Sequence, residues 1–317
     1  MADMLKDKVA LITGAGRGLG REEALAMAKE GCNLILNDLG GGFDGSGGEA
    51  KIADIIVDEV KKLGVKAVAN YDSVSDFNKA KGMIDQAVSE FGKLDIVVNN
   101  AGILRDRMLI NMAEKEWDDV QAVHLKGTFN VSRHACAYFR EICKADPNLK
   151  FPGRIINTAS DAGLLGNMGQ TNYGAAKAGI AAFTVIASME MKRGKYTTVN
   201  CIVPVARTRL TTDATPKMAD VMSKLDKSGF DVFDPANVAP MVVFLASDAG
   251  TKVNGEVFRV VADRVWVFQG WHTYNSISNN GKVFTPQELA ERVKKELMKG
   301  APRKETLMDA IGSMIKM

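Results

Sequence analysis

Three side chains in the middle of the sequence have the types and spacing needed to move a proton together with a hydride. Tyr173 and Lys177 are four residues apart at the start of a helical pattern, so they share one face of that helix. An ammonium group beside a phenol favours the phenolate and lowers a pKa that is normally about 10. Ser160 stands shortly before them, after an apolar run, and its hydroxyl can bind a substrate oxygen. We therefore predict that Tyr173 takes a proton from an alcohol whose carbon releases a hydride, and returns it in the reverse reaction.

A glycine-rich turn near the start of the chain predicts a dinucleotide site. The run Thr13-Gly-Ala-Gly-Arg-Gly-Leu-Gly20 links an apolar stretch, residues 9–12, to a helical pattern over residues 21–30. Glycines let the backbone approach a pyrophosphate, and the following helix N-terminus offers free N–H groups. The residues expected to bind the cofactor here are Gly14, Arg17, Gly18, Leu19 and Gly20.

An acidic residue, Asp38, ends the second apolar run. A carboxylate at this position accepts hydrogen bonds from the adenosine ribose and repels a 2′-phosphate, which favours NAD over NADP. Arg17 argues in the opposite direction, toward NADP, because a basic residue in the turn can face that phosphate. A solvated loop acid is the alternative interpretation of Asp38.

Polar and small residues also follow the third and fourth apolar runs. Asp72 and Ser73 stand where an adenine ring would lie. Asn99, Ala101 and Gly102 stand where small side chains would admit the nicotinamide ribose. For Asn99, hydrogen bonding within the sheet is an alternative role, and both roles are compatible.

The elements that must position these residues alternate regularly. Apolar runs predict seven strands, near residues 9–12, 33–37, 67–69, 94–98, 153–158, 198–203 and 256–261. Helical patterns separate them, over residues 21–30, 50–63, 78–91, 114–143, 173–193 and 235–247. This rhythm predicts an α/β fold with a doubly wound, parallel, seven-stranded Rossmann-type sheet. Residues 1–263 would form the NAD-binding domain, and residues 264–317 an extension with a helix that begins at Thr285.

Composition excludes several classes of protein. The formal net charge is +3 without a basic stripe, which argues against nucleic acid as a partner. No run approaches the length of a membrane span, and the start of the chain lacks a signal-peptide pattern. The four cysteines and three histidines show no metal-ligand spacing, so we expect no metal. We expect a cytoplasmic protein.

Taken together, the ordered motifs resemble the short-chain dehydrogenase/reductase family. The resemblance covers about residues 7–263 and includes the glycine turn, Asn99-Asn-Ala-Gly102, and the Ser, Tyr and Lys positions. It implies that Lys177 and Tyr173 also contact the cofactor. Many members carry asparagine where this chain has His124, so the resemblance implies a catalytic role for His124, with a packed histidine as the alternative.

Longer stretches resemble one branch of that family, the (3R)-hydroxyacyl-CoA dehydrogenase module of peroxisomal multifunctional enzyme type 2. This enzyme is also known as a 17β-hydroxysteroid dehydrogenase. Among them are residues 37–43, 67–74, 99–107, 123–127 and 166–173. The resemblance implies NAD, a CoA thioester substrate and a homodimer or homotetramer. It also implies a substrate lid over residues 206–233, in which Thr208 would contact the cofactor and Arg207 and Arg209 could meet a CoA phosphate or form a solvated face.

Three functional hypotheses remain open from the sequence. The first is NAD-dependent oxidation of a (3R)-3-hydroxyacyl-CoA to the 3-oxo compound. The second keeps the chemistry and changes the substrate to a steroid or an alicyclic alcohol. The third is a non-catalytic NAD-binding protein on the same fold, which the presence of both Tyr173 and Lys177 disfavours.

Overall fold

The central element is an eight-stranded sheet with the strand order β3-β2-β1-β4-β5-β6-β7-β8. The computed structural model describes residues 3–47, 51–208, 212, 222, 230–307 and 309–310. Seven strands run parallel: β1 (Val9–Thr13), β2 (Asn33–Asn37), β3 (Ala67–Asn70), β4 (Ile96–Asn99), β5 (Gly153–Thr158), β6 (Thr197–Val205) and β7 (Val257–Val261). The doubly wound α/β fold predicted from the sequence is confirmed.

The predicted number of strands needs one correction. An eighth strand, β8 (Arg264–Val267), pairs antiparallel with β7 at the edge of the sheet. Its four residues are all exposed, and it follows β7 without a crossover helix. Val265-Trp-Val267 is an apolar run in the sequence, but it follows β7 after only two residues and so departs from the alternation of strand and helix by which the strands were predicted. The sheet therefore continues into the segment that was assigned to the extension.

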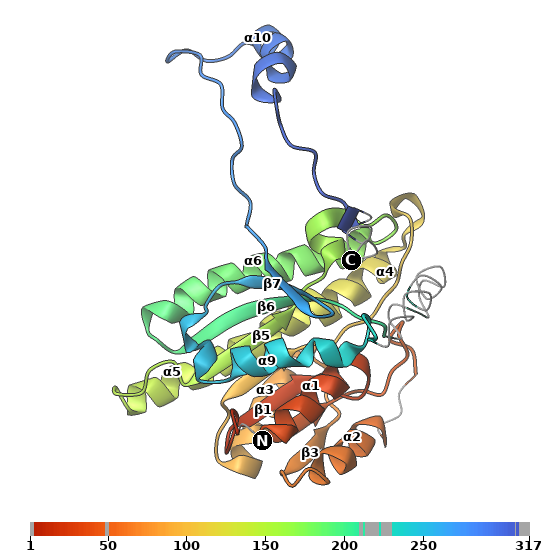
Figure 1. The fold of residues 1–317 in the computed structure, drawn as a ribbon, viewed down its shortest axis with the longest axis vertical. Helices are drawn as coiled ribbons and strands as arrows, with labels where there is room; N and C mark the ends of the chain where they lie inside the picture. Colours follow the sequence, from red (N-terminus) through yellow and green to blue (C-terminus); the bar gives the residue numbers. More distant parts are fainter. Residues whose placement is uncertain are drawn as a thin grey trace.

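Helices cover both faces of the sheet (Figure 1). On one face lie α1 (Gly18–Lys29), α2 (Lys51–Lys61) and α9 (Ala239–Ala246). On the other lie α3 (Phe77–Phe91), α5 (Gly127–Ala145) and α6 (Thr171–Arg193). Because both faces are covered, strands such as β1 and β4 are buried at every residue and read as continuous apolar runs.

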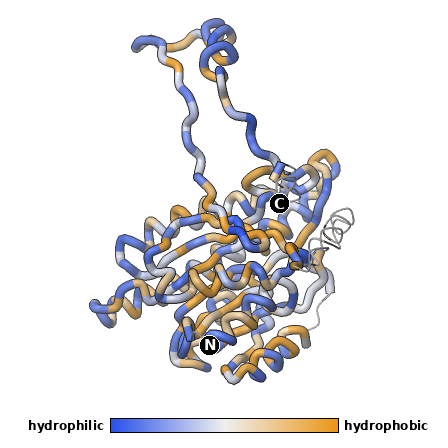
Figure 2. Tube along the Cα trace, in the orientation of Figure 1, coloured by the Kyte–Doolittle hydropathy of each residue, from blue (hydrophilic) through white to orange (hydrophobic). Residues whose placement is uncertain are grey.

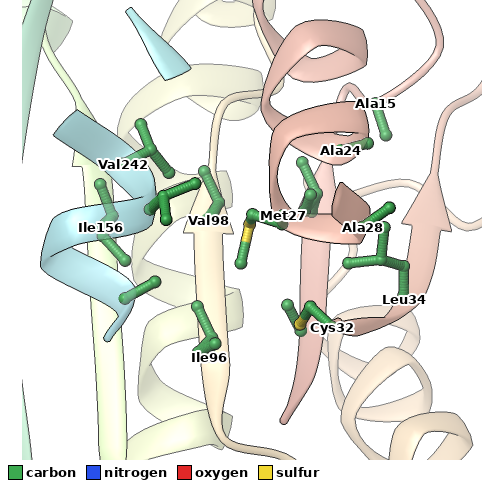
Figure 3. Close-up of a cluster of buried hydrophobic side chains, with 14 of the residues drawn as sticks. Ala15, Ala24, Met27, Ala28, Cys32, Leu34, Ile96, Val98, Ile156 and Val242 are labelled. Carbon is green, nitrogen blue, oxygen red and sulfur yellow. The ribbon is translucent and has the colours of Figure 1, made fainter. Parts of the chain in front are cut away.

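The first face illustrates how the core is filled. Met27 and Ala24 of α1 pack with Val98 of β4, Ile156 of β5 and Val242 of α9, as Figure 3 shows. All five side chains are buried. This packing fixes α1 against the sheet and so fixes the glycine turn that precedes it.

The long helical pattern over residues 114–143 is not one regular helix. It consists of α4 (Glu114–Gln121), a π-helical turn over Ala122–Lys126, and α5. Wide turns of this type occur frequently at functional sites. This one contains His124, whose side chain is buried.

The C-terminal segment leaves the sheet after β8 and returns to it. In Figure 1 the chain runs away from the body, carries α10 (Pro286–Arg292) at the far end, and comes back. Figure 2 shows hydrophilic and hydrophobic stretches interspersed along this excursion. Thr285 caps α10 through Glu288, as predicted, and the returning chain buries Ala310.

Two absences hold for the part of the chain that the structure describes. None of its helices combines the length and apolar character that crossing a membrane requires. Its histidine, cysteine and acidic side chains form no group of three or more that could hold a metal ion.

Candidate active site

A cavity of about 680 Å³ lies at the carboxyl ends of the parallel strands. In α/β sheets of this type, ligands bind at that edge. The cavity wall contains most of the residues predicted from the sequence: Gly14, Arg17, Gly18, Leu19, Asp38, Asp72, Ser73, Ala101, Gly102, His124, Ser160, Tyr173, Lys177 and Thr208. The predicted cofactor residues and the predicted catalytic residues thus share one cavity.

The glycine turn is held so closely that side chains would not fit. Gly14 has φ +64°, and a Cβ there would lie 2.8 Å from the Cα of Ala101. A Cβ on Gly20 would lie 2.2 Å from the carbonyl oxygen of Gly14. The side chain of Arg17 does not cap α1, and no acidic residue occupies the first turn. The first N–H groups of the helix are therefore available to an anion such as a pyrophosphate.

Asp38 is fixed by two backbone donors. The N–H of Gly16 donates to Oδ2 at 2.8 Å, and the N–H of Gly40 donates to Oδ1 at 2.7 Å. A carboxylate that accepts such bonds cannot rotate away from the cavity without losing them. The arrangement therefore presents a fixed negative charge beside the turn.

Two predicted cofactor residues are not among the described residues that line the cavity. Asn99 is buried, and its amide donates to Ser132 Oγ and to Asn157 Oδ1, both at 2.9 Å. Gly20 instead permits the tight approach to Gly14. The sequence analysis missed Asn100, which does line the cavity and donates to the Gly14 carbonyl at 3.1 Å. The two neighbouring asparagines are indistinguishable by type, and only the alternation along β4 separates them.

Ser160, Tyr173 and Lys177 meet at the same wall of the cavity. Ser160 follows β5, and its hydroxyl forms a hydrogen bond with the phenol of Tyr173. Lys177 is buried, and its Nζ donates to the carbonyl of Thr158 at 2.6 Å. The same Nζ lies 5.6 Å from the centroid of the Tyr173 ring. The predicted trio is therefore brought together.

The electrostatics of the trio differ from the expectation. Burial raises the pKa of Tyr173 to about 12, the charge of Asp106 adds to this, and the hydrogen bond with Ser160 opposes it. Burial lowers the pKa of Lys177 to about 8. The lysine is directed to the Thr158 carbonyl, so in this structure it does not lower the pKa of the phenol, and that prediction is wrong for the protein alone.

His124 is a neutral group packed against Tyr173. Burial, with a contribution from the charge of Lys177, lowers its pKa to about 3. The rings of His124 and Tyr173 meet edge-on, with centroids 5.1 Å apart. Nε2 lies 2.8 Å from the Ile103 carbonyl oxygen, and the backbone N–H of Ile103 points to the same Nε2 at 3.1 Å. Nδ1 is buried and has no hydrogen-bond partner among the described residues.

The backbone at the start of α6 is tied to a distant segment by Asn172. Its Oδ1 accepts from the N–H of Tyr173 at 2.7 Å, and its Nδ2 donates to the carbonyls of Arg105 and Glu116 at 2.9 and 3.0 Å. Gln121 donates in turn to the carbonyl of Asn172 at 2.8 Å. The position of Tyr173 thus depends on contacts with residues 105–121.

Part of the predicted lid can be placed. A Cβ on Gly18 would lie 3.3 Å from Cγ2 of Thr208, which puts this residue beside the glycine turn as expected. Arg207 forms an ion pair with Asp231, and its contact with a CoA phosphate stays a prediction. Arg209 and most of residues 209–229 lie outside the described residues. Val205 is the last residue of β6.

The fold and the site together define a class of protein: an α/β dinucleotide-binding fold with a Ser, Tyr and Lys at the carboxyl ends of its strands. The chain matches the family model described as short chain dehydrogenase over residues 8–219. It belongs to the short-chain dehydrogenase family and is an oxidoreductase.

Individual relatives narrow the comparison. The chain is 42% identical to the hydroxyacyl-CoA dehydrogenase ChsB1 of Mycobacterium tuberculosis over 90% of its length and 87% of that protein. It is 41% identical to the peroxisomal hydratase-dehydrogenase-epimerase of Saccharomyces cerevisiae over 91% of its length, but it spans only 30% of that protein. The crystal structure of a short chain dehydrogenase from Mycobacterium avium matches with a TM-score of 0.81 and 42% identity, covering 96% of this chain and 98% of the other.

Proposed function

We propose that this protein oxidises a (3R)-3-hydroxyacyl-CoA, or a closely related CoA thioester, to the 3-oxo compound with NAD. One observation carries the proposal: a single cavity contains the glycine turn and Asp38 together with Ser160 and Tyr173. The similarity to a relative named hydroxyacyl-CoA dehydrogenase supports the substrate class. In this cavity the nicotinamide ring, which accepts the hydride, and Tyr173, which accepts the proton, would both lie next to the alcohol carbon of the substrate.

The residues present fit a dinucleotide. The turn at Gly14 leaves no room for a side chain and opens onto free N–H groups of α1, as a pyrophosphate site requires. Asp38 presents a fixed carboxylate that would accept the ribose hydroxyls and repel a 2′-phosphate, which supports NAD over NADP. When bound, the oxidised cofactor supplies the hydride acceptor and a positively charged ring.

The chain's own residues handle the proton. Ser160 donates a hydrogen bond to the substrate oxygen, and Tyr173 accepts the hydroxyl proton as the carbon–hydrogen bond breaks. With a pKa of about 12 in the protein alone, Tyr173 holds its proton until a positive charge enters the cavity. Tyr173 would therefore become a proton acceptor only when the oxidised cofactor is bound, because positive charge nearby favours the phenolate.

A substrate panel tests the proposal. We expect turnover with NAD on 3-hydroxyacyl-CoA esters of the 3R series, and little on the 3S esters, steroids or alicyclic alcohols in the same panel. The absence of turnover on every CoA ester would end the CoA assignment, and turnover confined to steroids would establish the second hypothesis.

A pair of tyrosine variants tests the role of the phenol. Tyr173→Phe should lower kcat by about a thousandfold or more, since it removes the proton acceptor, while the affinity for NADH stays nearly unchanged. Tyr71→Phe is the matched control, because Tyr71 is exposed and its hydroxyl bonds to Asp54. Full activity in Tyr173→Phe would refute the assignment and favour a different base.

We also propose that the protein forms a homodimer or homotetramer. Phe129 of α5 and Val185, Ile186 and Met189 of α6 are apolar and between 42% and 68% exposed. Clustered apolar surface on two long helices is typical of a subunit interface. Light scattering decides the matter, and a strictly monomeric mass at micromolar concentration would contradict it.

A further inference from the structure

A buried ion pair lies immediately beside Ser160. Arg259 of β7 donates through Nε to Oδ2 of Asp161 at 3.0 Å, and its Nη2 lies 2.8 Å from the same oxygen. Asp161 is 4% exposed and Arg259 is 6% exposed. The two residues are far apart in sequence, and Asp161 lines the cavity. The pair therefore joins the loop that contains Ser160 to β7, the strand next to the edge strand β8.

The pair has no evident value for stability alone. Charges taken out of water lose hydration, and a buried ion pair is often no better than apolar side chains of the same volume. Here the second carboxylate oxygen, Oδ1, is buried without a hydrogen-bond partner among the described residues. The negative charge of Glu305, in the returning C-terminal segment, also repels the negative charge of Asp161. A pair that is costly in this way calls for another role.

The geometry of the loop identifies what the pair holds. Asp161 precedes a π-helical turn over Ala162–Gly166. The N–H of Ala162 donates to the Ser160 hydroxyl at 3.2 Å, and the N–H of Gly163 donates to the Ser160 carbonyl at 2.9 Å. A Cβ on Gly163 would lie 2.5 Å from the backbone nitrogen of Ala178, so the turn rests directly on α6. Rotation of Asp161 would move both donors to Ser160.

The other end of the pair is held from outside. The guanidinium of Arg259 lies 5.6 Å from the ring centroid of Trp266, its cross-strand partner on β8. An aromatic face over a guanidinium restricts its orientation as well as attracting its charge. The added edge strand thus completes a chain of contacts from Trp266 through Arg259 to Asp161.

We propose that Asp161 and Arg259 are a positioning pair that holds the Ser160 hydroxyl toward Tyr173. This proposal rests on the proposed roles of Ser160 and Tyr173, but not on the identity of the substrate. Because the pair is close to neutral as a unit, it fixes the loop without adding a net charge to the cavity. Loss of either partner would both loosen the loop and leave one buried charge uncompensated.

The test uses the two single variants, D161N and R259M, and the double variant D161N/R259M. D161N leaves a buried cation and should shift the pH dependence of oxidation to lower pH, whereas R259M leaves a buried anion and should shift it to higher pH. Both should lower kcat by about tenfold or more with little change in KM. The double variant should regain the wild-type pH dependence and keep the low kcat, because charge balance returns and positioning does not. R259K should retain more activity than R259M.

Matched measurements separate this proposal from loss of folding and from a wrong function. D85N removes a similar partner from the exposed Lys81–Asp85 pair on α3 and should change nothing. NADH affinity and Tm identify variants that have not folded. If a single variant does not fold, the double variant and R259K decide whether the pair positions Ser160. Wild-type kcat in the double variant, or pH shifts of the same sign in both single variants, would overturn the proposal. If the wild type rejects every CoA ester, the proposed substrate fails, and the same comparison is made with the secondary alcohol that it does oxidise.

Discussion

Glu23 of α1 offers a stability test that depends only on burial. Its side chain is fully buried, neither carboxylate oxygen has a hydrogen-bond partner among the described residues, and burial raises its pKa to about 8 from 4.5. A carboxyl group whose pKa is higher in the folded than in the unfolded state does not reduce the free energy of unfolding at a pH below its unfolded-state pKa. The folded state then loses stability as the pH rises toward the folded pKa. Between these limits the native protein must either hold a proton or bury a charge.

The size of the effect follows from the two pKa values. At 1.36 kcal/mol for each pKa unit, the penalty is roughly 4 kcal/mol at pH 8 and below about 1 kcal/mol at pH 5. A chain of 317 residues has an unfolding entropy of about 0.7 kcal/mol/K, so these penalties correspond to about 6 and about 1 °C in Tm. Glu23→Gln removes the ionisation and keeps the shape.

The assay is a thermal melt of wild type and Glu23→Gln across this pH range. The Tm of the variant relative to wild type should rise by about 5 °C from pH 5 to pH 8. Any constant offset from burying the amide cancels in that difference. Glu90→Gln, on the exposed surface of α3, is the matched control and should show no such trend. A difference in Tm that is the same at both pH values would refute the reasoning.

Three further predictions concern the cavity. Asp38→Ala should weaken NADH binding by about tenfold and reduce the preference over NADPH, measured by fluorescence titration; an unchanged ratio of the two affinities would contradict its role. Lys177→Met should lower kcat by about a hundredfold or more, because the buried ammonium 5.6 Å from the Tyr173 ring and its hydrogen bond to the Thr158 carbonyl are lost; a kcat close to that of wild type would contradict a role for the lysine. Gly14→Ala should cost about 1–3 kcal/mol of unfolding free energy, because φ is +64° and Ala101 is in the way; a denaturant melt like that of wild type would contradict this.

Much of the fold could be predicted because burial leaves a direct trace in the sequence. Strands β1 and β4 are covered on both faces, so each is an apolar run up to its last residue, Thr13 or Asn99, and the helices between them show their own period. The edge strand β8 was missed because it follows β7 without a helix between them, although Val265-Trp-Val267 is itself an apolar run. Val265 and Val267 in it are exposed, and their pairing with β7 depends on the fold of the whole sheet.

The site was predictable where function restricts residue type and order. Tyr173, Lys177 and Ser160 stand at strand ends and on one helix face, which spacing alone can indicate. The pKa of Tyr173 was not predictable, because it depends on how burial, Asp106 and the Ser160 hydrogen bond balance in three dimensions. The pairing of Asp161 with Arg259 was equally hidden, since nothing local links a loop acid to a strand arginine so distant in the chain.

The contacts of Asn172 make the position of Tyr173 depend on two stretches that are remote in the chain, the start of α6 and residues 105–121. The amide that orients the backbone of Tyr173 also binds the carbonyls of Arg105 and Glu116, and Arg105 lines the same cavity as Tyr173. A displacement of residues 105–121 would therefore also displace the backbone of Tyr173. We therefore expect that a substitution between residues 105 and 121 alters the rate without touching a reacting atom.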